Sequence, residues 1–528
     1  MKTFKKVTKV AVLMTLMSLM IAACTVEVKS AYPASYLEEI TISQLHEGYV
    51  NGKFTVSQIV TDYLSRIETI DKNGPMLNSI ITVNPDALKI AKELDKELSE
   101  GKIRGPMHGI PVILKDNIDT HDGMPTTAGA VILKNSFAPA DSRIVEMLRE
   151  AGAVIIAKAN LSEWANFRSN FSSSGWSGVG GQVKNPYFLD RNPCGSSSGS
   201  GASVSANLCV IAIGTETNGS IVCPSNNNGV VGFKPTVGLL SRTGIIPISF
   251  TQDTPGPMGR TVKDVAISLG VMTGPDSLDS KTLDPNAKFY NDYTQFLNVQ
   301  GLKGKRIGKI KSLGRAHHRV DSLINAAAEY MRSAGAEVIE LDFPYPGAAS
   351  AASFQVMLFE FKDGLNKYFE SLGDNAPVKN VTELIEFNMK DPVELRYFDQ
   401  ELLIMANEKG SLESPEYKEH LERMFKLTRE DGIDKIMNEN MLDAIISPTG
   451  SPAWKTDLIN GDNGRISSSS YAAVSGYPNI TLPMGFIDGL PVGISIFGRA
   501  WSEPVLLEIA FSYEQGTNHR KAPQFKNN

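Results

Sequence analysis

Cysteine is scarce in this chain. Only four of its 528 residues are cysteines, Cys24, Cys194, Cys209 and Cys223. Small secreted domains that are held by disulfides are dense in cysteine, so this count excludes such a framework, although it leaves open one disulfide among the last three. No two cysteines have the C-x-x-C spacing typical of a structural zinc site. We therefore expect a fold stabilised by its hydrophobic core, with no structural metal.

An excess of positive charge is also lacking. The chain has 52 Lys and Arg against 58 Asp and Glu, a net charge of −6, and no dense basic run after the N-terminus. Nucleic-acid binding needs a basic face, so nucleic acid is excluded as a partner. The 42% content of hydrophobic residues is ample for a large core.

A long apolar run is missing except at the N-terminus. Lysines at positions 2, 5, 6 and 9 precede the apolar run 10–23, which is too short to span a bilayer core of about 30 Å but fits the apolar region of a signal peptide. The run ends in Ile21, Ala22, Ala23 and Cys24, which resembles a bacterial lipobox, where the cysteine is lipidated and becomes the new N-terminus. We predict a lipoprotein-type signal peptide over 1–23, a tether over 24–34, and export to the bacterial cell envelope. The membrane would be contacted only through a lipid on Cys24. The alternative is a plain signal peptide and a soluble secreted or periplasmic protein.

The rest of the chain alternates helix and strand patterns. Apolar residues recur with helical spacing over 56–67 behind Thr55, a good N-cap, and over 505–513. Two segments, 109–157 and 305–343, each predict a strand, a helix and a second strand. The stretch 169–259 is rich in Gly, Ser, Asn and Pro, but apolar segments at 208–213 and 229–237 indicate buried strands between tight turns. With no internal repeat or charged linker, we predict one large α/β domain over 35–522.

Two short motifs offer competing chemistry. Residues 195–199 match G-x-S-x-G, which would make Ser197 the nucleophile of an α/β-hydrolase-type esterase. That motif requires a preceding strand, whereas the preceding segment 185–193 is turn-rich. Ser99 and Lys102 match S-x-x-K, but the companion motifs S-D-N and K-T-G of penicillin-recognising enzymes are absent from the sequence. We interpret the second match as accidental and keep Ser197 as an alternative nucleophile.

A third signal combines three distant segments: Lys115 at the end of an apolar strand, the serines 196–198, and the loop 214–220. Each alone has an ordinary structural explanation, since a lysine at a strand end usually holds its ammonium in water and serines beside glycines make turns. Together, the segments 109–117, 192–201, 214–224 and 229–236 resemble the motifs of the amidase-signature family, in the same order, and the resemblance covers nearly all of the chain after the signal peptide.

This resemblance implies a fold and a set of site residues. The fold would be α/β, with a large mixed β-sheet core covered by helices on both faces. Ser220 would be the nucleophile, Ser196 a bridging serine on a cis peptide bond, and Lys115 the base. The backbone N–H groups of Thr217, Asn218 and Gly219 would stabilise the oxyanion. No metal or organic cofactor would be needed.

The chemistry of these residue types agrees with those roles. A serine hydroxyl is a weak nucleophile without an adjacent base, and no histidine lies inside the motifs. A lysine serves as a base only in its neutral form. Moving its pKa from about 10.4 towards 7–8 requires roughly 3–5 kcal/mol of differential destabilisation, which burial without a contacting carboxylate supplies. Asp116 follows Lys115, but on an extended segment it should point to the opposite face.

Details of the motifs suggest a substrate class. Segments 194–201, 244–249 and 253–258 are most similar to the bacterial peptide-amidase branch, which removes a C-terminal amide from peptides and releases ammonia. Fatty-acid amides and oligoamides are alternative substrates within the family. The family's amidotransferase members work in the cytosol with partner chains, and the export signal argues against that role. Asn218, Ser198 and Val222 depart from the common pattern, which leaves loop geometry open.

A hypothesis of another class is a non-catalytic solute-binding lipoprotein. It explains the N-terminus but gives no reason for Lys115, Ser196 and Ser220 to occur in these contexts. We therefore predict an enzyme, with a small-molecule or peptide amide as its binding partner.

Overall fold

One eleven-stranded mixed sheet runs through the computed structural model, which describes residues 32–313, 317–343 and 346–527. The predicted signal peptide and Cys24 lie outside the described residues. The order of the strands is β1-β3-β2-β6-β8-β7-β12-β13-β11-β9-β10. Their bounds are β1 Ile80–Val83, β2 Pro111–Lys115, β3 Val154–Ala159, β6 Ile211–Glu216, β7 Val231–Lys234, β8 Thr254–Gly259, β9 Arg306–Ile310, β10 Glu337–Leu341, β11 Ala444–Pro448, β12 Asn479–Ile487 and β13 Leu490–Phe497. A separate ribbon pairs β4 Trp176–Ser177 with β5 Gly181–Gln182.

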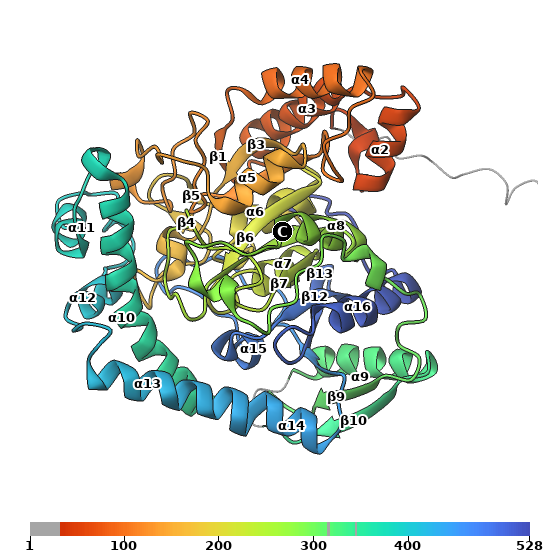
Figure 1. Cartoon of the computed structure of the whole chain (residues 1–528), viewed down its shortest axis with the longest axis vertical. Coiled ribbons are helices and arrows are strands. Elements are labelled where there is room, and N and C mark those ends of the chain that lie inside the picture. Colours follow the sequence, from red (N-terminus) through yellow and green to blue (C-terminus); the bar gives the residue numbers. More distant parts are fainter. Residues whose placement is uncertain (1–31, 314–316, 344–345, 528) are drawn as a thin grey trace, which may run out of the picture.

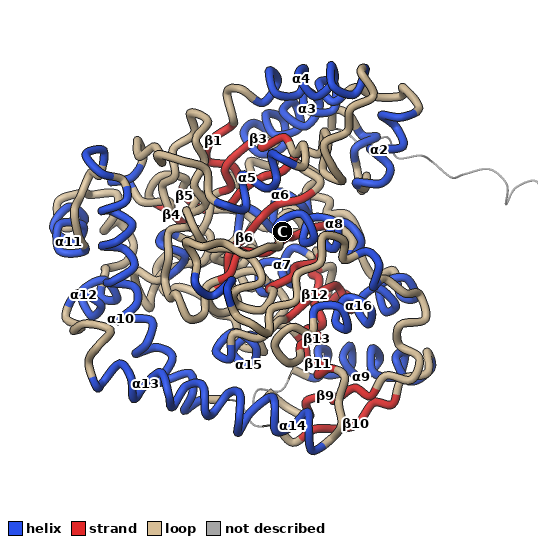
Figure 2. The backbone as a smooth tube through the Cα atoms, in the orientation of Figure 1, coloured by secondary structure: helices blue, strands red, loops and turns tan. Residues whose placement is uncertain are grey.

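Helices cover both faces of this sheet, as Figures 1 and 2 show. The α/β architecture with a large mixed sheet is therefore confirmed. The helices are α2 Ile42–Val50, α3 Val56–Arg66, α4 Ala87–Ser99, α5 Arg143–Glu150, α6 Ser198–Ser205, α7 Val222–Asn228, α8 Val262–Met272, α9 His318–Ser333, α10 Gly347–Ser371, α11 Val381–Asn388, α12 Glu401–Asn407, α13 Pro415–Phe425, α14 Asp434–Glu439, α15 Ser469–Ser475 and α16 Glu503–Thr517.

Local sequence signals explain several of these elements. Helix α3 begins where predicted, because the Thr55 side chain accepts a hydrogen bond from the backbone N–H of Gln58. Its residues Val56, Ile59 and Val60 are buried on one face. The predicted strands at 109–114 and 153–157 are β2 and β3, which pair in parallel through the α5 crossover.

The parallel part of the sheet positions the site. Strand β2 lies between β3 and β6, parallel to both, so the carboxyl ends of β2 and β6 meet at one edge. Lys115 is the last residue of β2, and the loop 217–220 follows β6 directly. Ligands of open α/β sheets bind at such carboxyl ends.

A run of helices from α10 to α14 extends along the left and lower edge of the molecule in Figure 1. Its apolar residues pack against the loops that follow β2 and β3. The shared cluster includes Leu358, Phe361 and Leu365 of α10 with Leu133 and Trp164 of those loops. This run therefore lies against the side of the molecule that carries the site.

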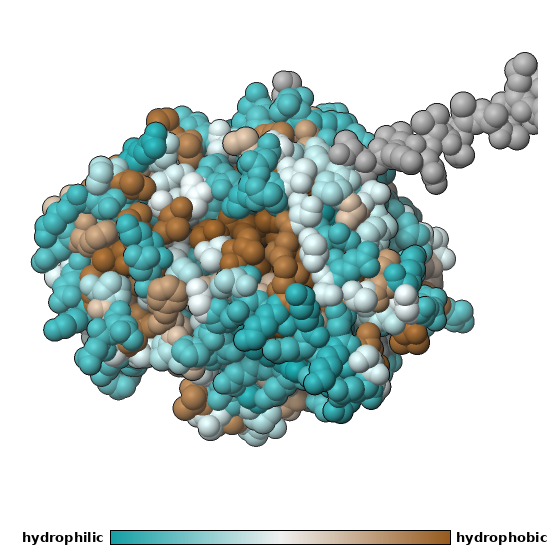
Figure 3. Space-filling model, turned by 90° about the horizontal axis from the view of Figure 1, so that it is seen from above, coloured by the Kyte–Doolittle hydropathy of each residue, from teal (hydrophilic) through white to brown (hydrophobic). Residues whose placement is uncertain are grey.

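Figure 3 shows a hollow lined by apolar side chains on the face seen from above. No helix in the described ranges is both long enough and apolar enough to traverse a bilayer.

Candidate active site

Lys115 is fully buried at the end of β2. Its Nζ donates to Ser196 Oγ at 2.7 Å, to Thr215 Oγ1 at 2.8 Å and to the Thr215 carbonyl oxygen at 3.2 Å. Burial lowers the pKa of Lys115 from 10.5 to about 7, against the opposing charges of Asp253 and Glu216. A substantial fraction of neutral amine is therefore present near neutral pH, as a base requires.

No carboxylate forms an ion pair with Lys115 in the described ranges. The neighbouring Asp116 points away, as predicted: its Oδ1 lies 3.8 Å from Nζ of Lys158, and its Oδ2 accepts a hydrogen bond from Thr127. Because side chains alternate along the strand, the Asp116 carboxylate lies beside Lys158 and away from Lys115. Burial therefore dominates the pKa of Lys115.

Ser196 follows a cis peptide bond between Gly195 and Ser196. A side chain at Gly195 has no room, because an added Cβ would lie 2.1 Å from Ser162 Oγ. The Ser196 carbonyl oxygen accepts a hydrogen bond from the Ser162 N–H at 3.1 Å. These contacts hold the fully buried Ser196 hydroxyl against Lys115.

Ser220 lies between β6 and α7 and is 8% exposed. Its carbonyl oxygen accepts a hydrogen bond from the Ser197 N–H at 3.1 Å, which ties the two serine segments together. A disulfide between Cys194 and Cys223 links the same two segments covalently. The sequence left open one disulfide among the last three cysteines. The structure pairs Cys194 with Cys223 and leaves Cys209 as a buried free thiol.

The loop 217–219 precedes Ser220. Thr217 Oγ1 donates to Asp253 Oδ1 at 2.5 Å, and Asn218 Oδ1 accepts from Ser469 Oγ at 2.7 Å. Gly219 has φ +87°, a conformation that favours glycine. Throughout the described part of the chain, none of the three backbone N–H groups donates a hydrogen bond to another residue. They are therefore available to an external acceptor.

The departures from the common motif have structural partners. Asn218 is fixed by the hydroxyls of α15, and Ser198 Oγ donates to the Cys194 carbonyl oxygen at 2.6 Å. Val222 is buried, and its N–H donates to Glu216 Oε2 at 3.0 Å. These side chains stabilise the loops locally.

Ser197 and the S-x-x-K match lie in different surroundings. Ser197 is fully buried, and its Oγ donates to the Thr215 carbonyl at 3.1 Å and accepts from the Thr215 N–H at 3.2 Å. No strand precedes it over 185–195. Ser99 Oγ donates to the Lys96 carbonyl on the exposed end of α4, and Lys102 pairs with Glu100.

Two residues at the site were not among the sequence-predicted ones. Thr215 supplies two of the three acceptors around Lys115, and Asp253 holds both Thr217 and the backbone of the 248–249 turn. Both lie inside the family-like segments 214–224 and 253–258, but no spacing rule distinguishes them from their neighbours.

A small pocket beside them is lined by Asn117, Thr215, Thr217, Ile246 and Asp253, among others. In the described ranges, no group of three or more His, Cys, Asp or Glu is arranged to hold a metal ion.

The fold and this site define a class. The model of the amidase family matches residues 58–507, so the chain belongs to the amidase (amidase-signature) family. It is an amide-hydrolysing enzyme, and the alternative of a non-catalytic solute-binding protein was wrong.

Particular relatives are similar over nearly the whole chain. The crystal structure of native peptide amidase from Stenotrophomonas maltophilia is 47% identical with a TM-score of 0.89, covering 92% of this chain and 99% of that one. A probable amidase of Arabidopsis thaliana is 41% identical over 501 residues, 93% of this chain and 92% of the relative. A putative amidase of Schizosaccharomyces pombe is 36% identical over 519 residues, 93% of this chain and 87% of the relative.

Proposed function

We propose that this enzyme is a peptide amidase that hydrolyses a C-terminal carboxamide to the acid and ammonia, using Ser220, Ser196 and Lys115. The observation that carries the proposal is the Lys115 amine, which is buried without a paired carboxylate, has its pKa lowered to about 7, and lies 2.7 Å from Ser196 Oγ. That arrangement supplies a base to a serine that, among the residues the structure describes, has no histidine as a hydrogen-bond partner.

In the first half of the reaction, neutral Lys115 accepts the proton of Ser196, and Ser196 accepts the proton of Ser220. The Ser220 Oγ attacks the amide carbon, and a C–O bond forms while the carbonyl π bond opens to an oxyanion. The N–H groups of Thr217, Asn218 and Gly219, which have no acceptor in the described part of the chain, stabilise this charge. The proton returns through Ser196 to the nitrogen, the C–N bond breaks, and ammonia leaves an acyl-enzyme on Ser220.

In the second half, water replaces ammonia. Lys115 and Ser196 remove a proton from the water, which attacks the ester carbon, and the collapse of the second oxyanion returns the proton to Ser220. The lysine starts and ends each half neutral, and every bond change involves only the three side chains, the amide and water. The cycle therefore requires neither a metal nor a cofactor.

The substrate class is supported by the likeness to the peptide amidase structure at 47% identity. Fatty-acid amides and oligoamides are the alternatives within the family. For the esterase hypothesis, the hydroxyl of Ser197 is turned to the Thr215 backbone, which argues against an exposed nucleophile.

Export to the bacterial cell envelope and lipidation of Cys24 are part of the proposal. The Cys194–Cys223 disulfide supports an oxidising compartment, because disulfides persist outside the reducing cytosol. Mass spectrometry of the protein purified from its membrane fraction tests this. A diacylglyceryl mass on an N-terminal Cys24 is the expected result, and an intact residue 1–23 segment would contradict it.

Ammonia release from amidated dipeptides, simple aliphatic amides and fatty-acid amides tests the activity. We expect the amidated dipeptides to be the best substrates, Ser220→Ala and Lys115→Ala to lose activity by at least about 10³-fold, and the adjacent Ser197→Ala to retain most of it. Full activity in Ser220→Ala with loss in Ser197→Ala would refute the assignment.

A further inference from the structure

The two serines each precede a short helix, and these helices pack together. Helix α6 begins two residues after Ser196, and α7 begins two residues after Ser220. Gly201 of α6 lies at the contact, where an added Cβ would be 3.0 Å from Asn228 Nδ2 and 3.2 Å from the Pro224 carbonyl of α7. A displacement of either helix would therefore move one serine relative to the other.

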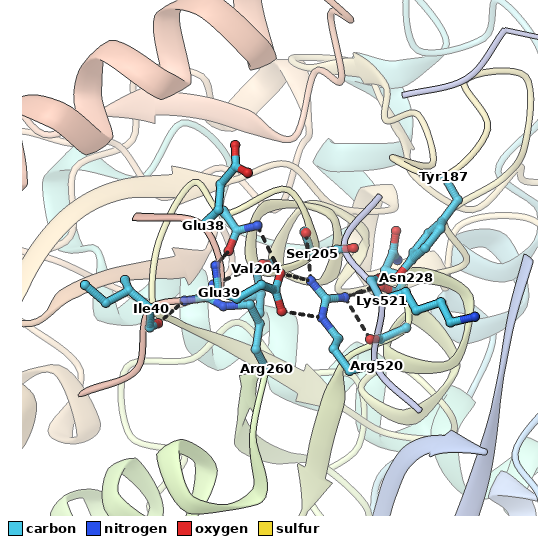
Figure 4. A network of polar contacts seen from close by, with 12 residues as sticks. Glu38, Glu39, Ile40, Tyr187, Val204, Ser205, Asn228, Arg260, Arg520 and Lys521 are labelled. Carbon is cyan, nitrogen blue, oxygen red and sulfur yellow. Dashed lines mark hydrogen bonds and ion pairs between the residues drawn. The ribbon is translucent and has the colours of Figure 1, made fainter. Parts of the chain in front are cut away.

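One side chain from the C-terminal segment reaches the far ends of both helices, as Figure 4 shows. Arg520 donates through one terminal nitrogen to the Ser205 carbonyl of α6 at 3.0 Å. Through the other it donates to the Gly229 carbonyl at 2.9 Å and the Asn228 carbonyl at 3.5 Å, at the end of α7. Carbonyls at a helix C-terminus lack intrahelical partners and carry partial negative charge, so a cation shared between two such ends stabilises both.

The guanidinium is itself held in place. Its Nε and one terminal nitrogen donate to the two carboxylate oxygens of Glu39 at 3.0 and 2.9 Å, and Arg520 is 14% exposed. Tyr187 fixes the segment further, since its hydroxyl donates to the Lys521 carbonyl at 2.5 Å. A planar guanidinium held in this bidentate way has little freedom to shift.

We propose that Arg520 is a positioning residue for catalysis: by joining the C-terminal ends of α6 and α7, it fixes the position of Ser196 relative to Ser220. The proposal rests on the Ser-Ser-Lys function above. The disulfide joins the same two segments at the serine end, so each end of the helix pair has its own link. Because α6 has eight residues, about 12 Å in length, a shift at its far end is transmitted to the serine end with little loss.

A neighbouring arginine provides a matched control. Arg260 is 3% exposed and donates to the Val204 carbonyl of α6 at 3.2 Å, to the Cys209 carbonyl at 2.7 Å and to the Ile40 carbonyl at 2.6 Å. It thus caps α6 but donates nothing to α7. Arg520→Gln and Arg260→Gln both remove a buried cation near α6, and only Arg520→Gln removes the link between the helices.

The test measures kcat, KM and melting temperature for the wild type, Arg520→Gln, Arg520→Lys and Arg260→Gln, well below each melting point. We expect Arg520→Gln to lower kcat by about 10- to 100-fold with KM changed by less than about threefold, as expected for misplacement of reacting groups by a fraction of an ångström. Arg520→Lys, which keeps the positive charge but not the bidentate geometry of the guanidinium, should restore part of kcat. The pH at which kcat/KM falls should not change, because the surroundings of Lys115 are intact.

Labelling of the active serine by a fluorophosphonate gives a second readout that does not depend on the amide substrate. Arg520→Gln should be labelled at least about tenfold more slowly than wild type, and Arg260→Gln at close to the wild-type rate. A labelled wild type that releases no ammonia from peptides would contradict the proposed substrate alone. A lowered melting temperature with unchanged kcat and labelling rate in Arg520→Gln, or an equal loss in Arg260→Gln, would overturn the positioning role. If Arg520→Gln does not fold, the same comparison is decided with Arg520→Lys.

Discussion

Replacing Lys115 with methionine should abolish turnover and yet make the protein more stable near neutral pH. Burial lowers the pKa of this lysine from 10.5 to about 7, whereas in the unfolded chain it returns to its ordinary value. At 1.36 kcal/mol for each pH unit, the protonated lysine costs the folded state about 5 kcal/mol. Methionine has a similar length and no charge to desolvate, so it removes this cost.

Part of that gain is offset by lost hydrogen bonds. The acceptors Ser196 Oγ, Thr215 Oγ1 and the Thr215 carbonyl oxygen each lose a donor, at roughly 1 kcal/mol apiece. At pH 7 the folded lysine is half deprotonated, which reduces the desolvation cost to about 4 kcal/mol, so the net expectation is a variant more stable by about 1 kcal/mol. Stabilisation on removing a functional group is the usual consequence of a site built for chemistry.

The sign of the effect should reverse with pH. Between about pH 7 and pH 10.5 the unfolded chain still binds a proton that the folded protein has lost, so the wild-type stability rises with pH over this range. Near pH 10 the desolvation cost has fallen to about 1 kcal/mol, and Lys115→Met should be the less stable protein by about 2 kcal/mol.

Chemical denaturation of both proteins from pH 6 to pH 10, with the disulfide intact, measures this. The exposed Lys367→Met is the control and should show no such crossing. A Lys115→Met variant that is less stable than wild type at pH 7, or a difference that does not change between pH 7 and pH 10, would refute a lysine held neutral by burial.

The kcat/KM of the wild type should fall below about pH 7, because the base must be neutral, and a profile flat from pH 5 to 9 would exclude Lys115 as the base. Asp253→Asn should move that fall to lower pH, since the Asp253 carboxylate stabilises the ammonium of Lys115; a move to higher pH would contradict this reasoning. Reduction of the Cys194–Cys223 disulfide by a dithiol should lower kcat at least about tenfold and reoxidation should restore it, whereas full activity in the reduced protein would show that the disulfide does not position the serines.

Much of the fold was predictable because its signals are local. The Thr55 cap and the apolar stripe of α3 are short-range patterns, and so is the β2-α5-β3 alternation. The segment 305–343 likewise became β9, α9 and β10 at nearly the expected bounds. In these elements the local sequence preference agrees with the role of the segment in the fold.

Strand β8 was not predicted, because its sequence contains Pro255 and Pro257, which argue against a central strand. The two prolines occupy alternate positions, so their missing N–H groups affect one edge of the strand. The adjacent strand β7 pairs with β8 only at Met258 and Gly259, which leaves that ladder short. Tertiary pairing therefore overrides the local signal.

The site itself depends on contacts between residues far apart in the chain. Lys115 and Thr215 meet because β2 and β6 are parallel neighbours, and Ser196 reaches them from the loop before α6. Periodicity cannot specify strand order, so the grouping of these residues came from the family resemblance. The Cys194–Cys223 pairing needed the same three-dimensional information.

The most direct test of the central claim is to find which serine is the nucleophile. The wild type, Lys115→Met and Ser220→Ala are treated with a fluorophosphonate, and the modified peptide is identified by mass spectrometry. We predict a single modification on Ser220 in the wild type and none in either variant. Modification of Ser197 in the wild type, or of Ser220 at an undiminished rate in Lys115→Met, would contradict the Ser-Ser-Lys mechanism.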